Sequence, residues 1–300
     1  MADPSSMSAK ELKALIASAG LMFNDCFEKS EFIARAKEAQ TVLEAGGGVP
    51  AAKAEGGGSR GGGCSAVKVG GYDCLVIGPE DPDLVVVILH GYGATNNDFR
   101  DIPKVMESMG KKIKYYLPQA PTNAAGMTEW WTINVMEWAM AMQQRTAGNE
   151  KPVGNLIRKE PPGLAECRKK LTIFLEEVCA GSKVDHSKVM LCGFSQGAMT
   201  ALDLALTLPK EKAVAGVTVI SGSTIVVEQW TQRLKEHPGL KVLITHGQSD
   251  MVLPCIASGW LNDLLRNGGA EVKYELHGGG HDLGGPNIMK KIAEHWASVM

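Results

Sequence analysis

Residues 189–202, VMLCGFSQGAMTAL, join a strand-like apolar run to a helix-like run through the pentapeptide Gly193-Phe194-Ser195-Gln196-Gly197. The pattern G-x-S-x-G between a strand and a helix is typical of a nucleophile elbow, a tight turn that exposes a serine oxygen at the end of the strand. Glycines two positions on either side of Ser195 relieve crowding of the backbone, and the N–H groups at the start of the helix favour developing negative charge. A chance Gly/Ser turn is the alternative, and the strand–turn–helix context weighs against it.

A serine hydroxyl is a weak nucleophile at neutral pH, so it needs a base, and the base needs an orienting acid. In proteins with this elbow the acid and then the histidine follow the serine along the chain. Asp250 follows the apolar run 242–245, and His281 follows the run 272–276. Both are therefore expected at the carboxyl ends of strands, on the same edge as Ser195, where open α/β sheets bind ligands. We predict that Ser195, Asp250 and His281 are the catalytic residues.

The remaining acids and histidines are weaker candidates. Asp282 is a poor orienting acid, because a neighbour at i+1 hardly reaches the inner nitrogen of its own histidine. Asp203 and Asp263 fall in helix-like stretches, where solvation or packing is the default role. No pattern separates the other histidines from surface or packing residues; they are His186, His237, His246, His277 and His295.

The oxyanion of an acyl-transfer reaction requires hydrogen-bond donors, usually backbone N–H groups. His90-Gly91-Tyr92-Gly93 follows the run LVVVIL at 84–89, which is apolar throughout, as in a strand buried on both faces. The N–H groups of Gln196 and Tyr92 are the expected donors. The alternative is that His90-Gly91 only makes a turn, and His90 itself is expected to be structural.

From residue 64 onward, strand-like and helix-like stretches alternate. This alternation predicts an α/β fold with a mostly parallel sheet and helices on both faces. A hairpin is expected over 66–77, with further strands at 84–89, 113–117, 189–194, 214–220, 241–245 and 272–276. Helices are expected near 99–109, 164–178, 196–208, 255–266 and 287–296.

The N-terminal part is organised differently. Apolar residues at helical spacing predict two helices within residues 8–45, the first ending at Gly20 and the second capped by Asn24 or Asp25. Residues 46–63 contain three GGG runs and read as a flexible linker, since no Gly-Lys-Ser/Thr follows the glycines as in a phosphate loop. We therefore expect a two-helix module (8–45), a linker (46–63) and a catalytic domain (64–300).

Composition limits the classes of function. The 300-residue chain is 44% hydrophobic and 21% charged, with a formal net charge of −2, and we expect no nucleic-acid partner. No stretch approaches the roughly 20 apolar residues that cross a bilayer, so no stable membrane insertion is expected. The seven cysteines are scattered and form no CxxC pair, which favours reduced thiols in the cytoplasm over a disulfide framework or a metal site.

The segment 121–145 is rich in tryptophan and methionine, including Trp130, Trp131 and Trp138. Such side chains make adaptable apolar surfaces, so the segment is a candidate lid or wall for an acyl chain, with Trp130 and Trp131 as candidate substrate-binding residues. The alternative is a buried helix that uses Ile133, Met136 and Met140.

Several ordered motifs from about residue 85 to the end resemble the phospholipase/carboxylesterase family of α/β-hydrolases, which includes the acyl-protein thioesterases. The motifs are LHGYG (89–93), LPQAP (117–121), Trp130-Trp131, GFSQG (193–197), HGQSDMVLP (246–254) and GGGHDL (278–283). One departure is the segment 131–162, which is longer than the usual acyl-binding loop. The N-terminal helices resemble the small two-helix modules related to the SAP family, and such modules usually mediate contacts, here with an unknown protein.

The family resemblance implies an α/β-hydrolase fold, no cofactor, and hydrolysis of carboxylic esters or fatty acyl thioesters on lipids or proteins. By position, it places the catalytic residues on Ser195, Asp250 and His281 and the oxyanion donors on Tyr92 and Gln196. Within enzymes, lysophospholipase is a near alternative. A catalytically silent α/β-hydrolase that serves as a ligand receptor or scaffold is the alternative from another class.

Overall fold

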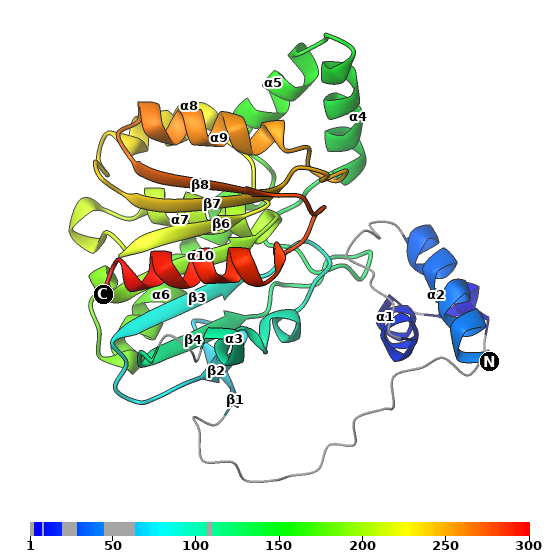
Figure 1. The fold of residues 1–300 in the computed structure, drawn as a ribbon, viewed down its shortest axis with the longest axis horizontal. Helices are drawn as coiled ribbons and strands as arrows, with labels where there is room; N and C mark the ends of the chain where they lie inside the picture. Colours follow the sequence, from blue (N-terminus) through cyan, green and yellow to red (C-terminus); the bar gives the residue numbers. More distant parts are fainter. Residues whose placement is uncertain (1–2, 8, 20–28, 45–63, 107–109) are drawn as a thin grey trace. The chain divides into compact units, whose positions relative to one another are not determined.

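The computed structural model describes most of the chain (Figure 1). The residues outside the description are 1–2, 8, 20–28, 45–63 and 107–109. The predicted linker at 46–63 and the predicted helix-end residues Gly20, Asn24 and Asp25 therefore lie outside the described residues. The chain divides into two compact units, residues 1–61 with 122–127 and residues 62–121 with 128–300. The predicted boundaries between module, linker and catalytic domain remain predictions.

The N-terminal unit contains helices α1 (Ala9–Ser18) and α2 (Lys29–Glu44), which pack against each other. Leu12, Ile16 and Phe32 are buried, as their helical spacing predicts. Both predicted helices are present, and the resemblance to SAP modules stays a prediction.

The second unit is built on an eight-stranded sheet whose order within the described residues is β1-β2-β4-β3-β5-β6-β7-β8. The β1–β2 hairpin and the β2–β4 pair are antiparallel, and every other pair is parallel. The predicted mostly parallel sheet is therefore confirmed. The strands are β1 (Ser65–Val69), β2 (Tyr72–Ile77), β3 (Leu84–Leu89), β4 (Ile113–Pro118), β5 (Val189–Phe194), β6 (Gly216–Ile220), β7 (Lys241–Gly247) and β8 (Glu271–His277).

Helices cover both faces of this sheet (Figure 1). The continuously apolar strands explain this arrangement, because alternate residues of β3 enter two different cores: Val85 and Val87 face one, and Val86 and Ile88 face the other. The first core is closed by α6 (Leu164–Ser182), α7 (Gln196–Thr207), α8 (Val227–Leu234) and α9 (Ile256–Asn267), and the second by α3 (Ile102–Met106) and α10 (Gly285–Ala297).

Four helices differ from the expectation. Helix α8 was not predicted, although Trp230 and Leu234 at helical spacing are both fully buried. Helix α3 begins only at Ile102, because Asn96–Phe99 forms a 3-10 turn with Thr95 and Asp98 as its capping box. The Trp/Met segment continues into a helical hairpin, α4 (Val135–Thr146) and α5 (Lys151–Arg158).

The parallel strands bring four loops to one edge of the sheet, because their carboxyl ends all meet there. These loops follow β3, β5, β7 and β8, and they carry Tyr92, Ser195, Asp250 and His281. None of the helices in the described part of the chain combines the length and apolar character that a membrane span requires.

Candidate active site

Ser195 occupies a strained turn between β5 and α7. Its φ is +53° and its ψ is −119°, a conformation that side-chain-bearing residues rarely adopt. A Cβ at Gly193 would lie 2.2 Å from the oxygen of Gly197, and a Cβ at Gly197 would lie 2.1 Å from the oxygen of Leu89. Both flanking glycines are therefore required by close backbone approach, and the predicted elbow is present. Ser195 stays partly exposed, whereas Gln196 beside it is buried.

The backbone N–H of Gln196, beside Ser195, is placed where an oxyanion donor is expected. The Ser195 N–H donates to the Ile220 oxygen at 2.9 Å. Gln196 is the first residue of α7, so its own N–H has no intrahelical acceptor and lies at the positive end of the helix. The loop after β3 is next to this turn, since a Cβ on Gly91 would lie 3.4 Å from the Cβ of Ser195. Tyr92 is thereby brought to the same edge as Gln196.

The loop after β3 is held rigidly by His90, which is fully buried. Its Nε2 accepts the Ala120 N–H at 3.0 Å, so the ring proton is on Nδ1, which lies 2.8 Å from the Gly91 oxygen. The Gly93 N–H donates to the Thr128 oxygen at 2.8 Å. With both ring nitrogens engaged in fixing the loop, His90 has the structural role expected for it.

The register of β7 and β8 brings Asp250 to His281. Pairing runs to Gly247 opposite His277 and then continues into the loops, where the Ser249 N–H donates to the Gly279 oxygen at 3.0 Å. A Cβ on Gly247 would lie 2.0 Å from the oxygen of Gly280, so only glycine allows this close approach. As a result, His281 Nδ1 lies 2.7 Å from Asp250 Oδ2, within a partly buried hydrogen bond.

The ring of His281 also packs against the residue that precedes the elbow serine. The ring centroids of Phe194 and His281 are 4.8 Å apart, with the planes tilted by 51°. The structure thus places Ser195, Asp250 and His281 in loops at the same edge of the sheet, as the sequence predicted, with Asp250 and His281 in contact.

The Asp250 carboxylate is surrounded by donors. Its Oδ1 accepts the N–H groups of Val252 at 2.9 Å and Leu253 at 2.8 Å, and its Oδ2 has His246 Nε2 at 3.2 Å in addition to His281. Burial acts to raise the pKa of Asp250. The hydrogen bonds from His246 and His281 and the charge of His281 outweigh burial and hold that pKa below its usual range. Asp250 is therefore an ionised acceptor.

Asp282 has a different task. Its two oxygens accept the N–H groups of Gly280 at 2.9 Å and Gly284 at 2.7 Å, within its own loop. These bonds lie within the turn that carries His281, and the carboxylate in contact with His281 Nδ1 is that of Asp250.

Trp130 and Trp131 form a buried strap between the two loops that carry the expected oxyanion donors. The Trp130 indole N–H donates to the His90 oxygen at 2.7 Å, and the Trp131 indole N–H donates to Thr200 Oγ1 at 2.9 Å. The side-chain amide of Gln196 accepts a hydrogen bond from the backbone N–H of Trp130 at 3.0 Å and donates one to the backbone oxygen of Trp131 at 2.7 Å. Both indoles are packed inside the protein, with Trp130 and Trp131 only 5% and 3% exposed. Their predicted contact with substrate stays a prediction.

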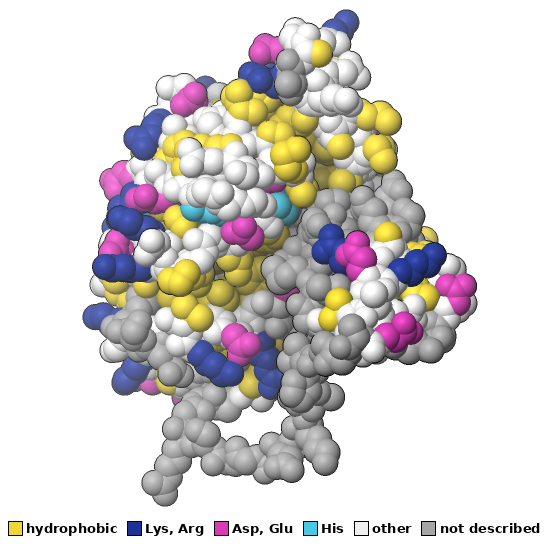
Figure 2. All heavy atoms as spheres, turned by 45° about the vertical axis from the view of Figure 1, so that its right-hand side comes forward, with side chains coloured by type: hydrophobic (Ala, Val, Ile, Leu, Met, Phe, Trp, Pro, Cys, Tyr) yellow, Lys and Arg dark blue, Asp and Glu magenta, His cyan; other side chains and the backbone are white. Residues whose placement is uncertain are grey.

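The α4–α5 hairpin presents apolar groups to solvent. The expectation of a helix buried through Met136 and Met140 is wrong, because they are 50% and 54% exposed; the buried side of α4 carries Ala141 and Met142. The hairpin packs on the loop after Asp250 through Leu253. Met251, directly after Asp250, is also exposed, and Figure 2 shows hydrophobic side chains gathered over this part of the surface.

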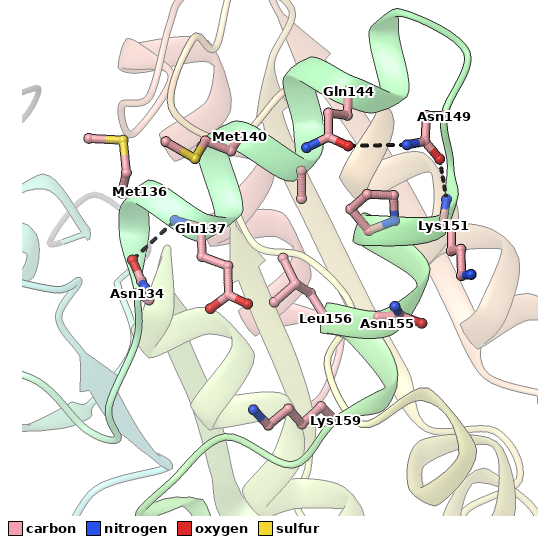
Figure 3. A pocket seen from close by; sticks show the side chains of 12 residues that line it. Asn134, Met136, Glu137, Met140, Gln144, Asn149, Lys151, Asn155, Leu156 and Lys159 are labelled. Atoms are coloured by element: carbon pink, nitrogen blue, oxygen red, sulfur yellow. Dashed lines mark hydrogen bonds between the residues drawn. The ribbon is translucent and has the colours of Figure 1, made fainter.

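A groove of about 640 Å³ separates the two helices of this hairpin (Figure 3). Leu156 of α5 points toward α4, and Met136 and Met140 lie at the rim of the groove. Its remaining lining is mostly polar, with Gln144 and Asn155 among the residues drawn.

Sequence reasoning missed two contributors to this site. The first is His246, which no sequence pattern separates from surface or packing residues and which is fully buried against Asp250. The second is the side chain of Gln196, which bonds to the backbone of Trp130 and Trp131. The usable signals were the position of His246 at the end of an apolar strand, four residues before the acid, and the LHGYG–Trp-Trp–GFSQG combination.

The fold is that of the α/β-hydrolases, and solved structures support it. The crystal structure of esterase PE8 has a TM-score of 0.60 and 21% identity, covering 80% of this chain and 99% of that chain. The Bacillus cereus carboxylesterase has a TM-score of 0.57 and 18% identity, covering 76% of this chain and 95% of that chain.

Residues 73–300 match the family model described as phospholipase/carboxylesterase, and the chain belongs to that family. A probable carboxylesterase, SOBER1-like, of Arabidopsis thaliana is 25% identical over 223 residues, which are 70% of this chain and 76% of that protein. Acyl-protein thioesterase 1 of Mycosarcoma maydis is 26% identical over 208 residues, which are 64% of this chain and 81% of that protein. Membership and relatives together support an ester or thioester hydrolase.

Proposed function

We propose that this protein is a serine hydrolase that cleaves carboxylic esters or acyl thioesters through an acyl-enzyme. Ser195 is the nucleophile, His281 the general base and acid, and Asp250 the orienting acid. The observation that carries the proposal is the 2.7 Å contact between His281 Nδ1 and the buried Asp250 carboxylate, beside a serine held in a strained elbow. Such a constellation is recognised by its geometry and roles.

The hydrogen-bond pattern assigns the tautomer of His281. Because Asp250 Oδ2 is an ionised acceptor, the His281 proton lies on Nδ1 and donates to it, which leaves the lone pair of Nε2 available. Nε2 then accepts the proton of the Ser195 hydroxyl as Oγ forms a bond to the carbonyl carbon of the substrate. The Asp250 charge stabilises the imidazolium that results.

The tetrahedral intermediate carries its negative charge on the former carbonyl oxygen. The N–H groups of Gln196 and Tyr92 are the proposed donors to that oxygen, and one such donor typically contributes roughly 3 kcal/mol of barrier lowering. Collapse breaks the bond to the leaving alcohol or thiol, which takes the proton from His281. A water molecule then gives a proton to His281 and attacks the acyl carbon. When the bond to Ser195 Oγ breaks, His281 returns that proton to Oγ, which releases the acid and regenerates Ser195.

The substrate class rests on the apolar surface beside the catalytic edge. Met136, Met140 and Met251 are exposed there, and adaptable thioether side chains suit an acyl chain of variable length.

The six cysteines that the structure describes are unpaired, which supports a reducing, cytoplasmic location as part of the same proposal.

Covalent labelling by a fluorophosphonate probe tests the proposal directly. The probe should label the wild type, and Ser195→Ala should abolish both labelling and turnover of p-nitrophenyl esters. The control for nonspecific damage is Asp203→Asn, because Asp203 is also a buried carboxylate but pairs with Arg168 and not with His281. A wild type that binds acyl ligands without labelling or turnover would favour the silent receptor over the enzyme, and activity confined to lysophospholipids would favour the lysophospholipase.

A further inference from the structure

A second histidine lies against the proposed catalytic acid. His246 and Asp250 are both closed to solvent, and His246 Nε2 lies 3.2 Å from Asp250 Oδ2 and 2.7 Å from the Leu253 oxygen. The proposed mechanism requires only one histidine, so the burial of a second imidazole at this carboxylate calls for an explanation.

The neighbours of His246 define its proton. A carbonyl oxygen and a carboxylate oxygen are both acceptors, so Nε2 carries the hydrogen and directs it toward both. The other ring nitrogen, Nδ1, is buried and has no hydrogen-bond partner among the described residues. A second proton on Nδ1 would leave a buried N–H without an acceptor, so the neutral ring is favoured.

The other titratable groups near this edge do not compete for Asp250. His277 Nδ1 faces Asp282 at 3.8 Å, and the oxygens of Asp282 accept N–H groups of its own loop. Asp250 is therefore fixed from three sides: by two backbone N–H groups on Oδ1, by His281 on Oδ2, and by the His246 N–H beside Oδ2.

We propose that His246 is a positioning residue, which holds the plane of the Asp250 carboxylate and withdraws part of its negative charge from His281. The inference rests on the proposed function, since it acts through the same catalytic pair. Because a carboxylate with fewer donors is a stronger base, loss of the His246 N–H should make Asp250 bind the protonated form of His281 more tightly. The base would then stay protonated to a higher pH, and activity would fall off earlier on the acidic side.

Two amide variants separate this role from packing. In His246→Gln the amide N–H reaches the place of Nε2, whereas in the shorter His246→Asn it does not. Neither amide titrates, so residue 246 itself contributes nothing to a shift in either profile. His246→Leu replaces His246→Asn if the latter does not fold, because it fills the site without a donor.

The measurement is kcat/KM for a small soluble ester across pH, with the melting temperature of each variant. His246→Asn should lose roughly tenfold in kcat/KM, within the range for a hydrogen bond to a charged group. Its acidic limb should move up by about half a pH unit, which is about 0.7 kcal/mol. His246→Gln should recover most of the activity and return the limb toward that of the wild type.

An unmoved acidic limb in His246→Asn, or equal impairment of both amides, would overturn the positioning role. Ser195→Ala distinguishes the two levels of failure. If Ser195→Ala retains turnover, the proposed function is wrong; if it is inactive while His246→Asn behaves as the wild type, only the role of His246 is wrong.

Discussion

At the carboxyl edge of the sheet, Asp250 is buried with donors on both of its oxygens, whereas on the α4–α5 hairpin Met136 and Met140 are half exposed. Strand register and close glycine contacts fix the positions of the side chains at the carboxyl edge. A side chain displaced there would lose its hydrogen bonds, and no other group would replace them. The hairpin packs on Leu253 and on Ala257 of α9, and its other side carries the exposed Met136 and Met140. We therefore expect the catalytic edge to tolerate little change and the surface of the hairpin to tolerate more.

The largest effect is expected at the elbow. Ser195→Ala should remove nearly all turnover while leaving the fold intact, because alanine tolerates the site but supplies no nucleophile. Residual catalysis over water of about 10³–10⁴-fold could persist from the oxyanion donors and binding. The measurement is kcat on a p-nitrophenyl ester beside the circular dichroism spectrum. Retention of more than about a tenth of wild-type kcat would show that Ser195 is not the nucleophile.

The two acids of the edge should differ sharply. Asp250→Asn leaves an amide beside His281 Nδ1 and favours the wrong tautomer, so kcat should fall by about 10⁴-fold. Asp282→Asn keeps an oxygen acceptor for its loop and should cost less than about tenfold, since its contacts are local hydrogen bonds. Steady-state kinetics of both variants decides between them. The reverse ranking would assign the orienting role to Asp282.

The strap predicts an intermediate effect on rate. Trp130→Phe keeps most of the buried ring and removes the N–H that holds the His90 oxygen, so kcat should fall by roughly tenfold with little change in KM. Trp131→Phe is the matched control, because its N–H binds Thr200 and not the loop after β3. The loss should be the same for acetyl and for dodecanoyl esters. A loss that grows with acyl length would instead assign Trp130 to the substrate.

The hairpin should show the opposite behaviour. Replacing Met136 and Met140 by Ser removes exposed apolar surface, so the melting temperature should change little. If an acyl chain lies there, each methylene taken out of contact costs roughly 0.8 kcal/mol, and long esters should suffer far more than acetyl esters. Ile173→Ser, exposed on α6, is the control. Equal activity of the double variant across a C2-to-C12 series would remove the hairpin from the substrate path.

The smallest effect is expected from the N-terminal unit. A chain lacking residues 1–63 keeps every strand of the sheet and all of the proposed catalytic residues. Its kcat/KM on a small soluble ester should therefore stay within about twofold of the full chain, and limited proteolysis of the full chain should cut first within 46–63. Loss of activity would mean that α1 and α2 belong to the catalytic fold or to its active oligomer.

The sequence predicted those parts of the site that depend on topology. Carboxyl ends of parallel strands must share an edge, so the positions of Ser195, Asp250 and His281 followed from three apolar runs and the glycines beside them. The position of His246 at the end of an apolar strand, four residues before Asp250, is a signal for burial near the acid, but the contact itself depends on how one loop turns back on itself. The exposure of Met136 and Met140 was equally inaccessible, since periodicity indicates a helix but not which side finds a partner.

The position of β8 in the sheet gives the proposed triad unequal local stability. Ser195 follows β5, which has neighbours on both sides. His281 follows β8, an edge strand that, among the described strands, pairs with β7 alone and is half exposed along its length. Local opening requires less free energy where fewer contacts are broken. Amide hydrogens of β8 should therefore exchange before those of β5, and heat should separate His281 from Asp250 while the central sheet is still folded. On heating, activity should then be lost below the temperature of global unfolding, because the loop that carries His281 opens first.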